Sequence, residues 1–296
     1  MLIWSVMSRR AHPEDLITIL RTPDIVDPVL VVQLDGWIDA GNSAADAMRR
    51  IRDATDPTVV ARFDTEWLID HRARRPTMHI SDGVNSGLDW PTIEISHGRD
   101  RNDRDILLLH GAEPDHNWRT FVETVVGFAI DRGVKRMVGL GAYPAAVPHT
   151  RPSRLSVTAS APDLAEGRDY ANASLDVPAG VESALELALA DAGIPSLGLW
   201  AQVPHYISTS PYPEASRALI DGLRDAGHVD IDAGPLAERA IVARGRLDDL
   251  IADEESHLQM VAELERRHDE ATSADAAPIT DDLAAEVEQF LRDQDG

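Results

Sequence analysis

The sequence predicts an α/β protein whose mostly parallel sheet carries helices on both faces. Three observations predict this fold class: short apolar runs rich in β-branched residues, amphipathic stretches of helical period between them, and a chain of 296 residues of which 43% are hydrophobic. Strands that alternate with helices form parallel sheets, because each crossover helix packs back onto the sheet. A chain of this length can fold as one large domain or two modest ones.

The first strand–helix–strand unit lies near the N-terminus. Apolar runs at 29–34 and 58–63 are typical of strands, and between them several alanines, Met48 and Ile51 recur on one face of a helix. This pattern predicts a strand–helix–strand unit of the kind that builds parallel sheets.

The turn LDGWIDAGN joins the first strand to the helix and contains two glycines. Asn42 or Ser43 could cap the helix and leave amide groups free to meet an anion. Asp35 and Asp39 flank the same turn, however, and two carboxylates would repel a phosphate. We therefore expect a turn at the ligand edge that holds Trp37 in a packed or intersubunit position and presents one of the two aspartates.

The remaining elements continue the alternation. Further strands are expected at 105–111, 135–142, 155–160 and 195–203, and further helices at 117–132, 179–192 and from 211 onward. The runs TMHI and TIEIS, separated by the turn-rich SDGVNSGLDWP, predict one or two antiparallel strands or a hairpin at the sheet edge. The pattern after residue 234 indicates a long amphipathic helix that is interrupted only at Gly245.

These elements divide the chain into three expected regions. They are a core domain of residues 1–210 with a β-hairpin insertion at about 76–96, a helical C-terminal region of residues 211–272, and an acidic tail of residues 273–296 with a short helix. For the whole acidic stretch from Leu247 to Gly296, a solvated helical face and terminus is favoured over a specific partner surface.

Composition excludes several classes of function. The net charge of −23 argues against nucleic acid as a partner, because nucleic-acid binding needs clustered basic side chains. The absence of cysteine excludes disulfides, thiolate metal sites and a cysteine nucleophile. Lys135 is the single lysine, and no apolar run reaches the roughly 20 residues that span a bilayer. We expect a soluble, cytoplasmic protein with no membrane partner.

Polar side chains gather where the expected strands run into loops, at the edge where parallel sheets bind ligands. The candidate ligand rim consists of Asp35, Asp39, Asn42, His110, His149, Arg151 and His205. His149 and His205 each follow Val-Pro after a strand, so either could be a general base or a hydrogen-bonding lock for a loop. A structural turn fixed by proline is an equal alternative. The planar guanidinium of Arg151 could bind a carboxylate or a phosphate in a bidentate manner, or form an intersubunit ion pair.

The loop after the strand at 105–111 contains side chains that could bind a metal ion. His110, Glu113, Asp115 and His116 carry side chains that suit zinc or manganese, but their loose spacing favours a helix cap by Asp115 or Asn117. We expect no metal and no cofactor. Because GxSxG, HExxH, Walker A and GxGxxG motifs are all absent, catalytic residues stay unassigned.

Three segments together resemble the actinobacterial branch of the proteasome assembly chaperone 2 family. They are LDGWIDAGNSAADA, VPHTRP and VPHYISTSPYPEASRALI, in this order and at this spacing, and the resemblance covers roughly residues 25–265. The resemblance implies a core similar to the phosphorylase/hydrolase-like fold, a β-hairpin insertion, an added helical C-terminal region and a homotrimer. Eukaryotic members of the family help to assemble the α-ring of the proteasome.

Two functions of different classes follow as expectations. The resemblance implies a non-catalytic assembly or scaffolding protein with a proteasome-related partner. The alternative is a nucleoside phosphorylase- or hydrolase-like enzyme, or a small-ligand-binding protein, with its site at the candidate rim. Phosphorylases surround phosphate with cations, and Arg151 is the only rim arginine, so the sequence favours the scaffold.

Overall fold

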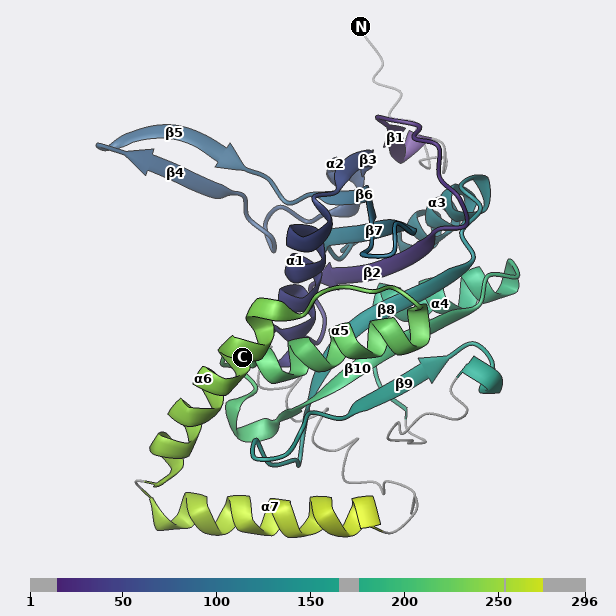
Figure 1. Ribbon diagram of the computed structural model, residues 1–296. Coiled ribbons are helices and arrows are strands. Elements are labelled where there is room, and N and C mark those ends of the chain that lie inside the picture. Colours follow the sequence, from purple (N-terminus) through teal and green to yellow (C-terminus); the bar gives the residue numbers. More distant parts are fainter. Residues whose placement is uncertain (1–14, 165–175, 253, 274–296) are drawn as a thin grey trace, which may run out of the picture.

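A computed structural model describes residues 15–164, 176–252 and 254–273 (Figure 1). Within these residues, eight strands form one sheet in the order β1-β3-β6-β7-β2-β8-β10-β9. The strands are β1 (Ile17–Ile19), β2 (Val29–Asp35), β3 (Thr58–Phe63), β6 (Ile93–Arg99), β7 (Asp105–Ala112), β8 (Arg136–Ala145), β9 (Leu155–Ala159) and β10 (Ser196–Pro204). The pairings β7–β2, β2–β8 and β8–β10 are parallel, and β3 shares their direction. The mostly parallel α/β architecture is confirmed.

Helices cover both faces of this sheet, as the sequence predicts. Two of them, α1 (Ser43–Thr55) and α5 (Pro213–Gly227), share one buried apolar cluster with the sheet. On the other face, α3 (Trp118–Asp131) and α4 (Val181–Asp191) share a second cluster, and the short α2 (Thr65–Leu68) contributes Leu68 to it. Figure 1 shows α1 and α5 in front of the strands. The expected helices at 117–132, 179–192 and after 211 are therefore confirmed.

The central strands are buried on both faces. In β7, Ile106 and Leu108 point into the cluster under α1 and α5, whereas Leu107 and Leu109 point into the cluster under α3 and α4. All four side chains are inaccessible to solvent. Burial on both sides explains why these strands are continuous apolar runs rather than alternating patterns. It also holds the carboxyl ends of the strands, and hence the loops of the candidate rim, in fixed positions.

The hairpin differs from the expected one. It consists of β4 (Thr77–Ser81) and β5 (Val84–Asp89), which form a separate two-stranded sheet that projects from the core (Figure 1). Asp82 and Gly83 both have positive φ angles, 50° and 81°, as an Asp-Gly hairpin turn requires. The expected second strand, TIEIS, instead belongs to β6, which lies inside the main sheet between β3 and β7. The edge placement was wrong because β5 is polar and was taken for a turn.

The C-terminal part contains two long helices after α5. They are α6 (Gly234–Ala252) and α7 (Glu255–Ser273). The expected interruption at Gly245 is wrong, because α6 continues through this residue. A Cβ atom at this position would meet no other atom within 4 Å. One glycine costs a helix only about 1 kcal/mol, which is too little to end it. The expected acidic tail lies outside the described residues, except for residue 273.

No helix in the described part of the chain is both long and apolar enough to span a membrane.

Candidate functional site

The strand order reverses beside β2, which is where open α/β sheets bind ligands. The chain leaves β2 through η2 (Ala40–Asn42) and α1 toward β3 on one side, and leaves β8 through β9 and α4 toward β10 on the other. Asp39 extends the edge by pairing with Ala142 of β8. A crevice at the carboxyl ends of β2 and β8 is therefore the natural candidate site.

The N-terminus of α1 is occupied by a carboxylate of the chain itself. Asp39 accepts hydrogen bonds from the amide nitrogens of Ala44 at 2.8 Å and Ala45 at 3.0 Å. Gly41 and Asn42 adopt left-handed conformations that turn the chain back so that Asp39 can reach these amides. The expected cap by Asn42 or Ser43 is wrong, because neither side chain caps α1. Asp39 takes the position that an anion would need.

The N-terminus of α4 is closed in the same way from another loop. Glu113, which follows β7, accepts a hydrogen bond from the amide of Val181 at 2.7 Å. Gly180 precedes this amide, and a Cβ atom there would lie 2.9 Å from the Trp37 ring and 3.2 Å from Glu113 Oε1. Glycine is therefore required for this close approach. Both helix starts beside the crevice therefore already hold a carboxylate of the chain.

Behind these two caps lies a small cavity that we call the acid chamber. It has a volume of about 20 Å³, and its lining includes Gln33, Trp37, Asp39, Glu113, Glu182 and Trp200. The carboxyl group of Glu182 is enclosed even though the residue as a whole is only half-buried, and its Oε1 atom has no hydrogen-bond partner. Trp37 and Trp200 meet edge to face with their ring centres 5.5 Å apart.

Burial raises the pKa of four carboxyl groups at the acid chamber, those of Asp39, Glu113, Glu182 and Glu186. It raises the pKa of Asp39 to about 6, against the lowering effect of the α1 amides, and it raises the pKa of Glu113. The pKa of Glu182 lies well above its ordinary value, first because of burial and then because Glu186, Glu113 and Asp39 repel its charge. Burial also raises the pKa of Glu186, although its carboxylate accepts a hydrogen bond from Thr158 at 2.7 Å.

An outer cavity of about 520 Å³ adjoins the acid chamber. Trp37 and Asp39 line both spaces, and the outer one is also lined by Asp35, Asn42, Asp46, Arg49 and Arg239. Its two arginines are paired with Asp46, at 2.6 Å for Arg49 and 2.7 Å for Arg239. The structure therefore brings three residues of the candidate rim together here: Asp35, Asp39 and Asn42.

His110 does not reach this rim. It lies within β7, is 5% exposed, and hydrogen-bonds with Ser96 of the adjacent strand at 3.1 Å. Burial, with a smaller effect from the nearby charge of Arg52, lowers its pKa to about 4. The imidazole is therefore neutral at physiological pH and acts as a hydrogen-bonding group beneath α1.

His149 joins the two Val-Pro-His motifs to α6. The hydroxyl of Tyr206, in η4 (His205–Ile207), accepts a hydrogen bond from the His149 amide at 2.9 Å and lies 2.7 Å from Nδ1. Nε2 lies 3.1 Å from a carboxylate oxygen of Asp248 in α6. Because a carboxylate can only accept, Nε2 carries the proton in its contact with Asp248, and Nδ1 of a neutral imidazole then accepts from the Tyr206 hydroxyl. His149 is thus the hydrogen-bonding lock that the sequence allowed.

Arg151 and His205 lie on either side of this lock. Arg151 forms ion pairs with Glu265 at 3.1 Å and Asp269 at 2.7 Å, so it binds α7 of its own chain. His205 is exposed, and its ring meets the Tyr206 ring edge to face at 5.4 Å between centres. His149 and Arg151 contact the C-terminal helices at a separate place from the acid chamber, and the seven rim residues do not converge on one site.

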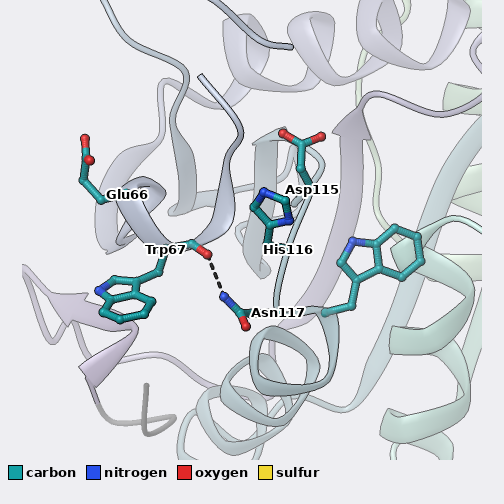
Figure 2. A pocket seen from close by; sticks show the side chains of 6 residues that line it. Glu66, Trp67, Asp115, His116 and Asn117 are labelled. Carbon is teal, nitrogen blue, oxygen red and sulfur yellow. Dashed lines mark hydrogen bonds between the residues drawn. The ribbon is translucent and has the colours of Figure 1, made fainter. Parts of the chain in front are cut away.

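Of the four alternative metal ligands, Glu113 lines the acid chamber, and His110 is buried in β7. Only Asp115 and His116 line another cavity, of about 730 Å³. Figure 2 shows Glu66 and Trp67 on one side of it and Asp115 and His116 on the other. Asp115 is held by Arg74 at 3.0 Å and by the amide of Asp70 at 2.8 Å. In the described ranges, no group of three or more potential ligands is arranged to hold a metal ion.

The expected cap of α3 is only partly correct. Asn117 occupies the capping position, in a left-handed conformation with φ of 57°, but its side chain donates to the carbonyl of Trp67 instead of accepting from the helix (Figure 2). Asp115 does not cap the helix either, because its two oxygens are used by Asp70 and Arg74.

Sequence reasoning missed the residues of the acid chamber on α4. A signal existed: in VESALEL, Glu182 and Glu186 stand four residues apart, next to Val181 and Leu185, on the face that must pack against the sheet. Trp200 gave no such signal, because an aromatic residue inside a buried strand is ordinary core. Only the fold shows that it meets Trp37 from another strand end.

Comparisons with known proteins identify relatives of this chain. A family model described as the PAC2 family matches residues 33–251. A PAC2 family protein from Streptomyces avermitilis is 38% identical, has a TM-score of 0.72, and aligns over 80% of this chain and 99% of its own. A Mycobacterium tuberculosis proteasome-assembly chaperone homologue is 32% identical, with a TM-score of 0.73 and the same shares. No protein of curated function matches the chain.

Two further solved structures extend the comparison. A Mycobacterium tuberculosis protein of unknown function is 31% identical with a TM-score of 0.84, and the alignment covers 94% of this chain and 96% of that one. An archaeal proteasome activator from Pyrococcus furiosus has a TM-score of 0.60 at 17% identity, over 79% of this chain and 97% of its own. At that identity the likeness shows the fold alone.

The first prediction concerns the enclosed carboxyl group of Glu182. Its raised pKa favours the folded state below the unfolded value near 4.5, and this contribution is lost as the pH rises above that value. Glu182→Gln removes the ionisation, so the variant should gain stability over the wild type as the pH rises to about 8. A gain of about 1–3 kcal/mol is expected. Urea unfolding at a series of pH values measures it, and parallel curves for the two proteins would contradict the raised pKa.

The second prediction concerns the contact between Arg151 and α7. Arg151→Ala should increase hydrogen exchange in residues 255–273 by roughly two- to fivefold, which is the scale of an exposed ion pair. Added salt should reduce the difference between the two proteins, because it screens the pairs. Arg266→Ala is the matched control, since Arg266 pairs only with Glu263 and Glu270 inside α7. Equal exchange in the Arg151 and Arg266 variants would show that α7 is held by other contacts.

Proposed function

This chain belongs to the PAC2 family, and we propose that it is a non-catalytic assembly or scaffolding protein whose partner is proteasome-related. One observation carries the proposal: the side chains that could form an active site are used within the chain. Asp39 and Glu113 cap helices, and His149 and Arg151 bind α6 and α7. A relative at 32% identity is described as a proteasome-assembly chaperone homologue, which supports the choice of partner.

The same observation argues against the phosphorylase alternative. Phosphate binding needs free amides at a helix start or a group of unpaired cations. Both helix starts at the crevice hold carboxylates, and the two arginines of the outer cavity are paired with Asp46. A phosphate entering the crevice would meet Asp39 and Glu113 rather than a cation.

The projecting hairpin offers a surface for the partner. Met78 and Leu88 lie opposite each other on one face, Ile80 follows on the same strand, and these side chains are 52%, 43% and 63% exposed. Two strands alone are barely stable in water, and exposed apolar groups on such an element are typical of a protein-binding surface. We assign this face to the proteasome-related partner, and we expect the chain to act as a homotrimer, as its family resemblance implies.

A pull-down with proteasome α-subunits from the same organism tests this proposal. The wild-type chain should retain α-subunits at micromolar concentration, and the double variant Met78→Ser/Ile80→Ser should lose at least about tenfold in affinity, the usual effect of removing two apolar contacts at an interface. Ile241→Ser is the matched control, because Ile241 is 74% exposed but lies on α6.

Two outcomes would contradict the proposal in different ways. If the wild-type chain fails to bind α-subunits, the partner is wrong. If it binds and the hairpin variant binds equally well, the docking face is wrong while the partner stands. The mass of the chain measured by light scattering tests the trimer separately, and a monomeric mass at micromolar concentration would contradict it.

A further inference from the structure

The acid chamber and the outer cavity have two lining residues in common, Trp37 and Asp39. The chamber, at about 20 Å³, can hold one group of the size of a water molecule, whereas the outer cavity, at about 520 Å³, can hold a longer chain. A ligand that fits this shape has a small head and an extended tail.

The groups around the chamber determine the charge of that head. Asp39 and Glu113 line it from two different loops and Glu182 lines it from α4, with Glu186 beside Glu182 on the same helix. Every charged group that acts on Glu182 is a carboxyl group. The charges of Asp115 and Arg74 also act on Glu113, and the charge of Asp35 acts on Asp39. Arg74, however, already donates hydrogen bonds to the Asp115 carboxylate and to the carbonyl of Asp35.

An independent observation points to a ligand in this space. The Oε1 atom of Glu182 is enclosed and has no hydrogen-bond partner, which ordinarily costs about 1–3 kcal/mol. Asp39 and Glu113, by contrast, already accept backbone hydrogen bonds. A positively charged donor in the chamber would satisfy Glu182 and offset the repulsion among the carboxylates at the same time.

The walls of the chamber suit an ammonium group. Trp37 and Trp200 border it, and indole rings attract cations through their faces. Gly139 of β8 leaves the space that the Glu182 carboxyl group occupies, since a Cβ atom there would lie 1.9 Å from Oε1. The chamber is too small for a guanidinium or quaternary ammonium group, and the described residues include no set arranged to hold a metal ion.

We propose that the acid chamber binds a primary ammonium group whose carbon chain lies in the outer cavity. The ammonium group donates to the unpartnered Oε1 atom of Glu182, its charge offsets those of Glu113 and Asp39, and the tail passes Trp37. The same chemistry is offered by a free alkylamine and by a lysine side chain of a protein partner. This site is independent of the hairpin face, so it can exist whether or not the chain binds proteasome subunits.

Binding is linked to protons. Burial raises the pKa of the carboxyl groups of the chamber, and an ammonium group favours their ionised forms. Ligand binding should therefore release protons, and the affinity should rise as the pH increases through about 6, the pKa of Asp39, because alkylamines with a pKa near 10 stay charged there.

Titration calorimetry on the full chain tests the proposal with three probes. Butylammonium chloride represents a free amine, N-acetyl-lysine amide represents a partner's lysine, and 1-butanol is the neutral control of the same length. At least one cationic probe should bind with a Kd of about 10 mM or lower, and the Kd should fall as the pH rises. The measured heat of binding should depend on the ionisation enthalpy of the buffer, because binding releases protons. Preference for one cationic probe identifies the source.

Two variants distinguish binding in the acid chamber from non-specific attraction of a cation to an acidic protein. Glu182→Gln should lose at least about tenfold in affinity and most of the proton release, although Gln keeps the shape of the side chain. Glu66→Gln is the control, because Glu66 is an exposed carboxylate outside both cavities. Failure of both cationic probes to bind, equal binding of 1-butanol, or equal loss in the Glu66 variant would each overturn the proposal.

Discussion

The contact on which the candidate site depends is the one between Asp39 and the first amides of α1. It closes the helix start that an anion would use, and it turns Asp39 inward, away from the exposed Asp35. Glu113 repeats the arrangement at α4 from the neighbouring loop. Two helices on opposite faces of the sheet thus direct their positive ends at carboxylates of the chain, and the crevice between β2 and β8 becomes acidic instead of cationic.

The motifs that carry the family resemblance serve two different purposes. The first, around Asp39, builds the crevice. The second and third meet through His149 and Tyr206 and hold α6, while Arg151 holds α7. These C-terminal contacts are largely polar, with Val261 and Leu264 as buried apolar anchors on α7. A surface built in this way places the two helices firmly enough to keep a defined shape while leaving their outer side chains, such as Ile241, in solvent.

The fold was predictable from the sequence and the site only in part. Strands such as β7 are recognisable because burial on both faces demands a continuous apolar run, and helices such as α3 because one apolar face recurs. The hairpin was misplaced because β5 carries polar residues in solvent, although Asp82-Gly83 was a turn signal. The seven rim residues do not form a single site, because the position of a strand end does not determine the direction of the side chains near it. His110 points under α1, and His149 points toward α6.

The acid chamber remains unexplained by packing. A chain that needed only to fill this space could place apolar side chains at positions 182 and 186, next to Val181 and Leu185, and avoid the repulsion among four carboxyl groups. The sheet is buried on both faces and can offset a local cost of this size. Local rules are broken most often where function requires it. A buried carboxyl oxygen without a donor, at the place where α/β sheets bind ligands, is such a break, and a cationic ligand removes it.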